Sequence, residues 1–287
     1  TEPYKSMLDS ARQKFRAMNY FLRIGPNCYL GRGTGISSTP QRCAQELRTA
    51  YTSPRNDVII SVGGGELMCE ILDDIDFNKL KDAQPRWFMG FSDNTNFTFL
   101  LTTLCDTASI YGPCATAFVM EPWHASLYDA LGLLTGQKLS FDSYGLWEKE
   151  SLRDETHPLL PYHLTENEQL TLVNTRGGFL SMKGRLLGGC MDCLENLIGT
   201  EYDHVAAFNH TYGGDGILWF LEACDLNVMS IRRTLWHMEH AGWFTHASGF
   251  LIGRPASGDA MMGLDHIRAV TDILGKYHVP ILLDADL

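Results

Sequence analysis

The chain has 287 residues, of which 45% are hydrophobic and 20% are charged, and its net charge at pH 7 is −11. These values are typical of a soluble globular protein with one large or two modest domains. The excess of acidic residues argues against a nucleic acid or an anionic membrane as a partner, because phosphate groups would be repelled. No stretch approaches about 18 uninterrupted apolar residues, so we expect no membrane span.

Eight cysteines are scattered through long apolar segments. In a chain of this size they indicate reduced, buried thiols in a cytoplasmic protein, and the polar start of the chain does not have the pattern of a signal peptide. Cys190 and Cys193 form a CxxC pair without a second pair or a histidine at ligand spacing, so we expect two core thiols and no metal site. We predict no cofactor.

Helical and strand-like patterns alternate through the first half of the chain. Helices are predicted over 1–22, 39–53, 65–75 and 94–107. The first has an apolar side made of Met7, Ala11, Phe15, Met18 and Leu22, and the second is capped by Thr39, has Pro40 in its first turn and ends before Pro54. Strands are predicted over 57–62, 86–92 and 108–113. Alternation at this spacing indicates a parallel sheet with helices on both faces.

The second half begins with a polar connector over about 136–180 that leads into short strands. Strand and helix patterns then alternate again to a last strand over 279–287. We therefore predict an α/β fold in two parts. Residues 1–140 form a flavodoxin-like parallel sheet with helices on both faces, and residues 141–287 form a linker and a smaller α/β domain.

The segment WFMGFSDNTNFTFLL, residues 87–101, passes from an apolar run through Gly-Phe-Ser-Asp to a second apolar run. A Gly-x-Ser bend between a strand and a helix can expose Ser92 as a nucleophile, with the Asp93 backbone N–H at the helix start. Gly63 and Gly64, at the end of the neighbouring strand, would add backbone donors to an oxyanion hole. The spacing alone favours the alternative of a helix cap and turn glycines, because the second glycine of G-x-S-x-G is missing.

Glu222 ends the strongly apolar segment ILWFLE. Carboxylates are seldom buried without a partner, so this residue is a candidate for the acid that orients a catalytic histidine. A solvent-facing acid at the end of a strand explains the pattern equally well.

The segment GFSDNT resembles the Gly-Phe/Tyr-Ser-Asp-x-Thr signature of serine peptidase family S66, which holds the LD-carboxypeptidases and the microcin C self-immunity hydrolases. The resemblance runs in order from about residue 30 to residue 287. Its further segments are DVIISVGGGELMCEIL, YGPCAT, GRLLGGCMDCLENLIGT, ILWFLEACDLNVMSIRRTLWHMEHAGWF and GFLIGRP.

This resemblance implies a Ser-His-Glu triad split across the two domains. Ser92 is the expected nucleophile, Glu222 the acid that orients the histidine, and the N–H groups of Asp93 and Gly64 the oxyanion donors. In the family the histidine follows the strand that matches VPILLDADL. We therefore expect it just beyond Leu287, and we expect the chain to be trimmed at both ends. The reaction is acyl transfer through Ser92 without a metal.

The histidines within the chain are weaker candidates for the base. His124 lies nearest the predicted cleft, but an active-site role there is the less common case. His237, His240 and His266 fall in predicted helices with apolar neighbours, and His278 precedes the last strand, at the wrong end for a site at strand C-termini.

Family LD-carboxypeptidases remove the terminal D-alanine from the tetrapeptide of recycled cell-wall muropeptide. The resemblance thus implies a small peptide or muropeptide substrate, a cytoplasmic role in peptidoglycan recycling, and a homodimer. A substrate carboxylate requires a cationic anchor, for which we single out Arg232; Gly63 and Tyr111 are further candidates for substrate contact. The other candidate cations are Arg185, Arg233 and Arg254.

Two alternatives remain. Tyr111 stands where many LD-carboxypeptidases have histidine, as in the immunity-type members, so a peptidyl- or aminoacyl-nucleotide is the second substrate class. The aromatic residues of the connector either stack on a ring of such a substrate or pack a domain interface; they are Trp123, Tyr144, Trp147 and Tyr162. A non-catalytic protein that binds small ligands on the same fold is the third hypothesis.

Overall fold

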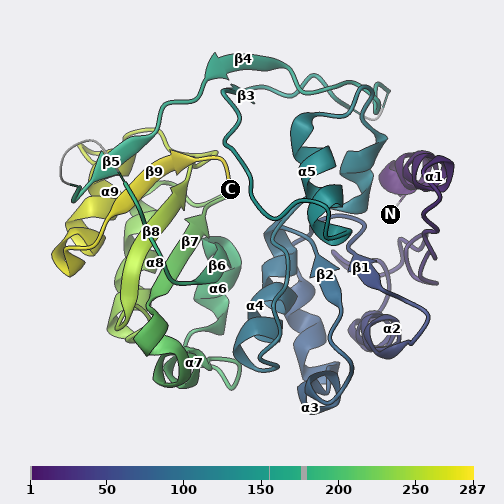
Figure 1. The fold of residues 1–287 in the computed structure, drawn as a ribbon, viewed down its shortest axis with the longest axis horizontal. Coiled ribbons are helices and arrows are strands. Elements are labelled where there is room, and N and C mark those ends of the chain that lie inside the picture. The colour runs from purple at the N-terminus through teal and green to yellow at the C-terminus, as the bar shows by residue number, and fades with distance from the viewer. Residues whose placement is uncertain (1, 155, 176–179) are drawn as a thin grey trace. The chain divides into compact units, whose positions relative to one another are not determined.

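The computed structural model describes residues 2–154, 156–175 and 180–287. The chain forms two compact units (Figure 1): the first runs up to Asn94 and resumes over Thr107–Glu168, and the second comprises Thr95–Asp106 and Gln169–Leu287. The predicted α/β class with parallel pairing is confirmed. This division does not coincide with the boundary predicted after residue 140, because residues 141–168 of the predicted connector fall in the first unit and Thr95–Asp106 falls in the second.

The first two helices of the first unit follow their predicted signals. Helix α1, Glu2–Ala17, is shorter than predicted and is followed by Asn19, whose φ of +65° is left-handed and stops the helix. Helix α2, Pro40–Thr52, starts where the Thr39 hydroxyl accepts a hydrogen bond from the Arg42 N–H. Residue 1 of the predicted first helix lies outside the described residues.

The sheet of the first unit is short. Strands β1, Val58–Ile60, and β2, Trp87–Met89, pair in parallel. The predicted third strand over 108–113 is wrong as a strand: Ile110 forms one isolated parallel bridge with Met89. The N–H groups of Ile110 and Gly112 donate to the carbonyl oxygens of Phe88 and Gly90 at 2.9 and 3.4 Å, so the segment runs beside β2 and forms a single bridge.

The predicted helix over 65–75 has a different form. The structure has a 3₁₀ helix, η1, Met68–Asp74, followed by a short α-helix, α3, Phe77–Lys81. Two acids, Asp73 and Asp74, end η1, and negative charge at a helix C-terminus opposes the helix dipole. This charge placement gives a physical reason for the absence of a longer α-helix at this position.

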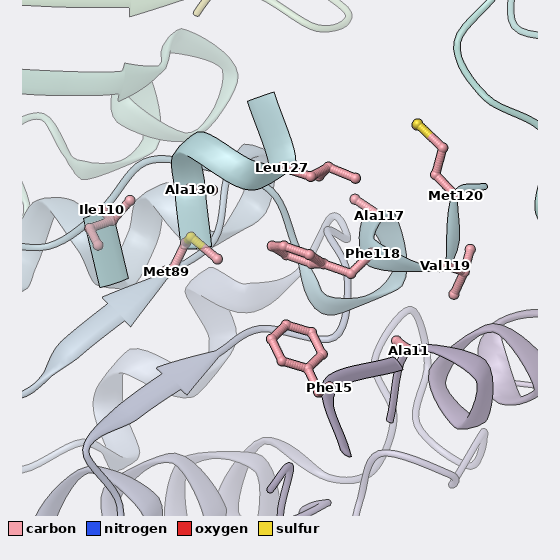
Figure 2. Packing of buried hydrophobic residues seen from close by; sticks show 10 residues of the cluster. All are labelled: Ala11, Phe15, Met89, Ile110, Ala117, Phe118, Val119, Met120, Leu127 and Ala130. Atoms are coloured by element: carbon pink, nitrogen blue, oxygen red, sulfur yellow. The ribbon is translucent and has the colours of Figure 1, made fainter. Parts of the chain in front are cut away.

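Helix α1 supplies one side of the core of the first unit (Figure 2). Ala11 and Phe15, on the predicted apolar face, pack into a buried cluster with Phe118 and residues around it. The rings of Phe15 and Phe118 lie 5.1 Å apart between centroids. The cluster also contains Met89 of β2, so the core supports the end of the strand that precedes Ser92.

The remaining elements of the first unit are η3, Ala115–Val119, α5, Ala125–Leu134, and the antiparallel strands β3, Leu146–Glu148, and β4, Leu164–Asn167. Strands β3 and β4 lie within the predicted connector and in the first unit, whereas the short strands were expected where the connector leads into the second domain. The end of that predicted connector, residues 176–179, lies outside the described residues.

The second unit contains a five-stranded sheet of order β5-β9-β8-β7-β6. Strands β6 to β9 are parallel, and β5 pairs antiparallel with β9. The strands are β5, Thr171–Val173, β6, Arg185–Cys190, β7, Ile217–Glu222, β8, Ala247–Gly253, and β9, Ile281–Ala285.

Helices of the second unit pack on this sheet around a buried aromatic cluster, in which Trp243 stacks on both Trp219 and Phe99. The helices are α4, Thr95–Thr103, α6, Met191–Leu197, α7, Val205–Tyr212, α8, Val228–His240, and α9, His266–Leu274, with short 3₁₀ turns η4, Gly213–Asp215, and η5, Gly275–Tyr277. In the described parts of the chain, no helix has both the length and the hydropathy that a membrane span requires.

Candidate active site

Ser92 occupies a strained bend. It follows β2 after Gly90 and Phe91 and opens the 3₁₀ turn η2, Ser92–Asn94. Its φ is +60°, a left-handed value that costs a non-glycine residue about 1–3 kcal/mol. A serine held in this conformation between a strand and a helix has the backbone form of a nucleophile elbow, which exposes the hydroxyl above the strand end.

The glycine loop after β1 lies directly against this bend. A Cβ atom added to Gly64 would lie 3.2 Å from both Cβ and Oγ of Ser92, and one added to Gly65 would lie 3.0 Å from Oδ2 of Asp93. Ser92, Asp93 and the loop glycines are thus brought together, as two adjacent parallel strand ends allow. Any side chain larger than hydrogen at Gly64 would crowd the serine hydroxyl, which explains the residue type there.

Two side chains fix the backbone around the serine. The Tyr111 hydroxyl accepts a hydrogen bond from the Ser92 N–H at 2.9 Å. The side-chain amide of Asn94 donates to the carbonyl oxygens of Phe91 and Gly63 at 2.9 and 3.1 Å. Tyr111 was singled out from the sequence for substrate contact, and the structure adds a backbone contact at the bend; the role of Asn94 was not recognised from the sequence.

Glu222 is the last residue of β7 and is half-buried. It lies at the carboxyl end of a parallel sheet, opposite Cys190 in the register between β6 and β7. The neighbouring strand leaves no space beside it: a Cβ atom on Gly253 would lie 2.7 Å from Glu222 Cβ. This acid therefore has a fixed backbone position at the edge where ligands bind in parallel sheets.

Asp192 anchors the turn that follows Glu222. Its carboxylate accepts hydrogen bonds from the N–H groups of Cys224 and Asp225 at 3.1 and 3.0 Å. Neither Asp192 nor Gly253 stood out in the sequence as a site residue. An acid inside the CxxC segment and a glycine at the end of the adjacent strand were the available signals, but their partners are 32 and 31 residues away in the chain.

Cys190, the first residue of the CxxC pair, lies beside Glu222 on the neighbouring strand. A hydrogen bond with the Cys193 thiol, together with burial and the negative charge of Glu222, raises the pKa of Cys190 well above its ordinary value. Cys190, Cys105 and Cys114 are buried as predicted, whereas Cys193, expected as the second core thiol of the pair, is half-buried and Cys224 is exposed. In the described residues, histidine, cysteine and acidic side chains form no cluster of three that could hold a metal ion.

The candidate arginines are engaged in ion pairs or side-chain hydrogen bonds. Arg232 on α8 donates to the Asp272 carboxylate of α9 at 2.6 Å, so its role in substrate binding stays a prediction. Arg254 follows the carboxyl end of β8 and donates to Asp286 at 3.1 Å. Arg185 pairs with Asp215 across the exposed start of β6, and Arg233 donates to Ser230.

The candidate histidines lie on α8 and α9, at the start of α5 and before β9. His237 and His240 are exposed on α8, whereas His266 is buried at the start of α9. His278 precedes β9, at the end of the strand opposite to Glu222 in the parallel arrangement. His124 caps α5, where its ring accepts from the Ser126 N–H and packs edge-on against Tyr144 and Tyr162.

Aromatic residues of the connector are likewise engaged in packing. The indole N–H of Trp123 donates to the Phe118 carbonyl, and that of Trp147 donates to Asn167 across the β3–β4 pair. The Tyr144 hydroxyl donates to Asp129 at 2.8 Å. These contacts account for the aromatic residues as structural parts of the first unit.

Comparison with known proteins identifies the family. The family model for the LD-carboxypeptidase N-terminal domain, Peptidase S66, matches residues 1–112, and the model for the LD-carboxypeptidase C-terminal domain matches residues 183–287. The "Putative carboxypeptidase" of Streptomyces coelicolor is 24% identical over 253 residues, which cover 87% of this chain and 69% of that protein. A protein of the same description from Synechocystis sp. is 22% identical, with 87% and 70% covered.

Solved structures share the fold. The microcin C7 self-immunity protein MccF in its wild-type apo state matches with a TM-score of 0.80 and 19% identity, over 99% of this chain and 84% of that chain. The muramoyltetrapeptide carboxypeptidase from Oxalobacter formigenes matches with a TM-score of 0.69 and 17% identity, over 97% and 83%.

The two family models define the class as serine-peptidase hydrolases. The family models together account for most of the chain, from both halves and in the expected order. The chain belongs to the Peptidase S66 family. The resemblance predicted from the sequence motifs is therefore confirmed.

Proposed function

We propose that this protein cleaves an amide bond by acyl transfer through Ser92. The observation that carries the proposal is the backbone of Ser92, which has a left-handed φ of +60° and lies directly against Gly64. Backbone strain of this kind is retained where the surrounding structure enforces it, and such positions cluster at active sites. The membership of the S66 family supports the same reaction class.

In the proposed reaction, the Ser92 hydroxyl attacks the amide carbonyl and a histidine accepts its proton. The resemblance to the family implies that this base is a histidine, and it assigns the orienting acid to Glu222. The N–H groups of Asp93 and Gly64 hold the negative oxygen of the tetrahedral intermediate, where each donor is worth about 3 kcal/mol. The tetrahedral intermediate collapses with cleavage of the C–N bond, and the histidine gives the proton to the leaving amine. Water, deprotonated by the same histidine, then hydrolyses the acyl-enzyme and frees Ser92.

For the substrate, we propose the tetrapeptide of recycled muropeptide, from which the enzyme removes the terminal D-alanine. The family description as LD-carboxypeptidase supports this choice. A terminal carboxylate requires a cation, and Arg232 remains the residue predicted from the sequence. Its ion pair with Asp272 would have to open for this role, so the charge-neutral variant Arg232→Gln tests the assignment through KM.

A peptidyl- or aminoacyl-nucleotide amide is the second candidate substrate. The observation that favours it is Tyr111, since the resemblance places histidine at this position in many LD-carboxypeptidases. The identity to the solved MccF structures is below 25%, so their ligands carry no weight for this chain. The two classes differ in the leaving group and not in the chemistry at Ser92.

The deciding experiment offers both substrates to the full-length protein. Purified enzyme is incubated with muropeptide tetrapeptide and, separately, with an aminoacyl-sulfamoyl adenylate, and products are quantified by mass spectrometry. Release of D-alanine supports the carboxypeptidase assignment. Exclusive turnover of the adenylate would exclude it and would leave the second candidate.

A non-catalytic ligand-binding protein on the same fold is the alternative from another class. The variant Ser92→Ala separates the two, because it removes the nucleophile and leaves the binding surface in place. We further propose a cytoplasmic homodimer; light scattering at micromolar concentration measures the mass, and a monomer would refute the assembly.

A further inference from the structure

The loop between β1 and η1 is held at both ends by the two residues that follow Ser92. At its start, the Asn94 side-chain amide donates to the Gly63 carbonyl at 3.1 Å. At its end, the Asp93 carboxylate accepts a hydrogen bond from the Met68 N–H, with N···O distances of 3.0 and 3.2 Å to its two oxygens. These side-chain contacts therefore join the loop that contains Gly64 to the bend that contains Ser92.

Both side chains are buried, with 7% of Asp93 and 3% of Asn94 exposed. A buried hydrogen bond to a charged acceptor is among the stronger kinds, and removing the acceptor leaves the donor unsatisfied. The carboxylate also has little room to move, since a Cβ atom on Gly65 would lie 3.0 Å from its Oδ2. The Asp93 side chain thus determines where the end of the loop lies.

We infer that the Asp93 carboxylate is a positioning residue for the oxyanion hole, because it sets the place of the Gly64 N–H relative to the Asp93 N–H. This inference rests on the proposed function, in which these two groups are the donors. Donors act only within about 2.7–3.1 Å of the developing oxyanion, so a loop shift of about 1 Å removes one of them. The backbone of Asp93 supplies one donor while its side chain holds the loop that supplies the other.

Three variants of the full-length protein distinguish the effect of side-chain length at position 93 from the effect of its charge. Asp93→Ala removes the acceptor and is expected to lower kcat for the cleaved substrate about a hundredfold with KM changed less than about threefold. Asp93→Asn retains an acceptor oxygen at the same length and is expected to keep kcat within about threefold of the wild type. Asp93→Glu keeps the charge but adds a methylene, so it should lose activity as Asp93→Ala does.

A second measurement reports on the loop without any chemistry. Hydrogen exchange followed by mass spectrometry should show faster exchange over residues 63–68 in Asp93→Ala than in the wild type, with Asp93→Asn close to the wild type. The matched control is Asp76→Ala, which removes an aspartate that accepts from the Lys79 N–H at the start of α3 in the same unit. The control should leave both kcat and exchange over 63–68 unchanged.

The outcomes distinguish this inference from the proposed function. If the wild type hydrolyses neither substrate, the proposed function and the catalytic part of the inference both fail. Faster exchange in Asp93→Ala would then show only that the Asp93 side chain stabilises the loop over residues 63–68. If the wild type is active and Asp93→Ala keeps its kcat, or Asp93→Asn falls as far as Asp93→Ala, the inference alone is overturned. Unchanged exchange over 63–68 in Asp93→Ala overturns it as well.

Discussion

Replacing Gly253 with alanine tests whether the position of Glu222 matters for catalysis. The new Cβ atom would lie 2.7 Å from Glu222 Cβ, 3.3 Å from its Cα and 3.6 Å from the Leu221 carbonyl oxygen. Carbon atoms in contact are ordinarily about 3.5–4.0 Å apart, so the end of β7 or β8 has to move by about 1 Å. The atoms that must move are backbone and Cβ atoms, which cannot rotate away as a flexible side chain would.

The expected loss has two parts. Overpacking of this kind costs about 1–3 kcal/mol of unfolding free energy, which lowers Tm by a few degrees. A displacement of about 1 Å at a catalytic group lowers the rate about a hundredfold. We therefore expect kcat/KM of Gly253→Ala to fall by about two orders of magnitude while the protein remains folded at 25 °C.

The assay is hydrolysis of the accepted substrate by the full-length protein, with circular dichroism as the test of folding. Gly214→Ala is the control, since a Cβ atom there would have no neighbour within 4 Å. In a Glu222→Ala background, Gly253→Ala should lower kcat/KM less than about threefold, because the carboxylate whose displacement matters for the rate is absent, although the Cβ contact remains. Full additivity of the two substitutions, or a wild-type kcat/KM in Gly253→Ala, would refute the reasoning.

Three further predictions follow from the site and the core. Ser92→Ala should abolish hydrolysis and leave substrate binding by calorimetry unchanged; residual turnover would show another nucleophile. Tyr111→Phe removes the hydroxyl that accepts from the Ser92 N–H and should lower kcat about fivefold at constant KM, whereas a rise in KM alone would indicate substrate contact. Burial lowers the pKa of His266 below its ordinary value of 6.5, against the smaller opposing effect of Asp284. Below about pH 6.5 the unfolded chain therefore binds a proton that the folded chain binds less readily. The unfolding free energy consequently decreases as the pH is lowered. His266→Gln should reduce that fall in urea titrations, and the exposed His240→Gln should not; equal slopes in all three proteins would contradict the burial argument.

The sequence by itself determined the local features of this protein. Thr39 and Pro40 specified the start of α2, the spacing of Ala11 and Phe15 specified the buried face of α1, and Gly-Phe-Ser-Asp located the bend at Ser92. These signals lie within a few residues of the structure that they specify, because capping, helical periodicity and backbone bends depend on short-range hydrogen bonds and sterics.

Tertiary structure alone decided the contacts around the candidate site. The hydrogen bonds from Ser92 to Tyr111 and from Met68 to Asp93 join residues 19 and 25 positions apart, and Gly253 meets Glu222 across neighbouring strands. The 3₁₀ helix η1, which forms within the α-helix predicted over 65–75, also has its first residue, Met68, in such a contact with Asp93. Strand pairing and packing choose such partners, and residue type and spacing along the chain leave that choice open.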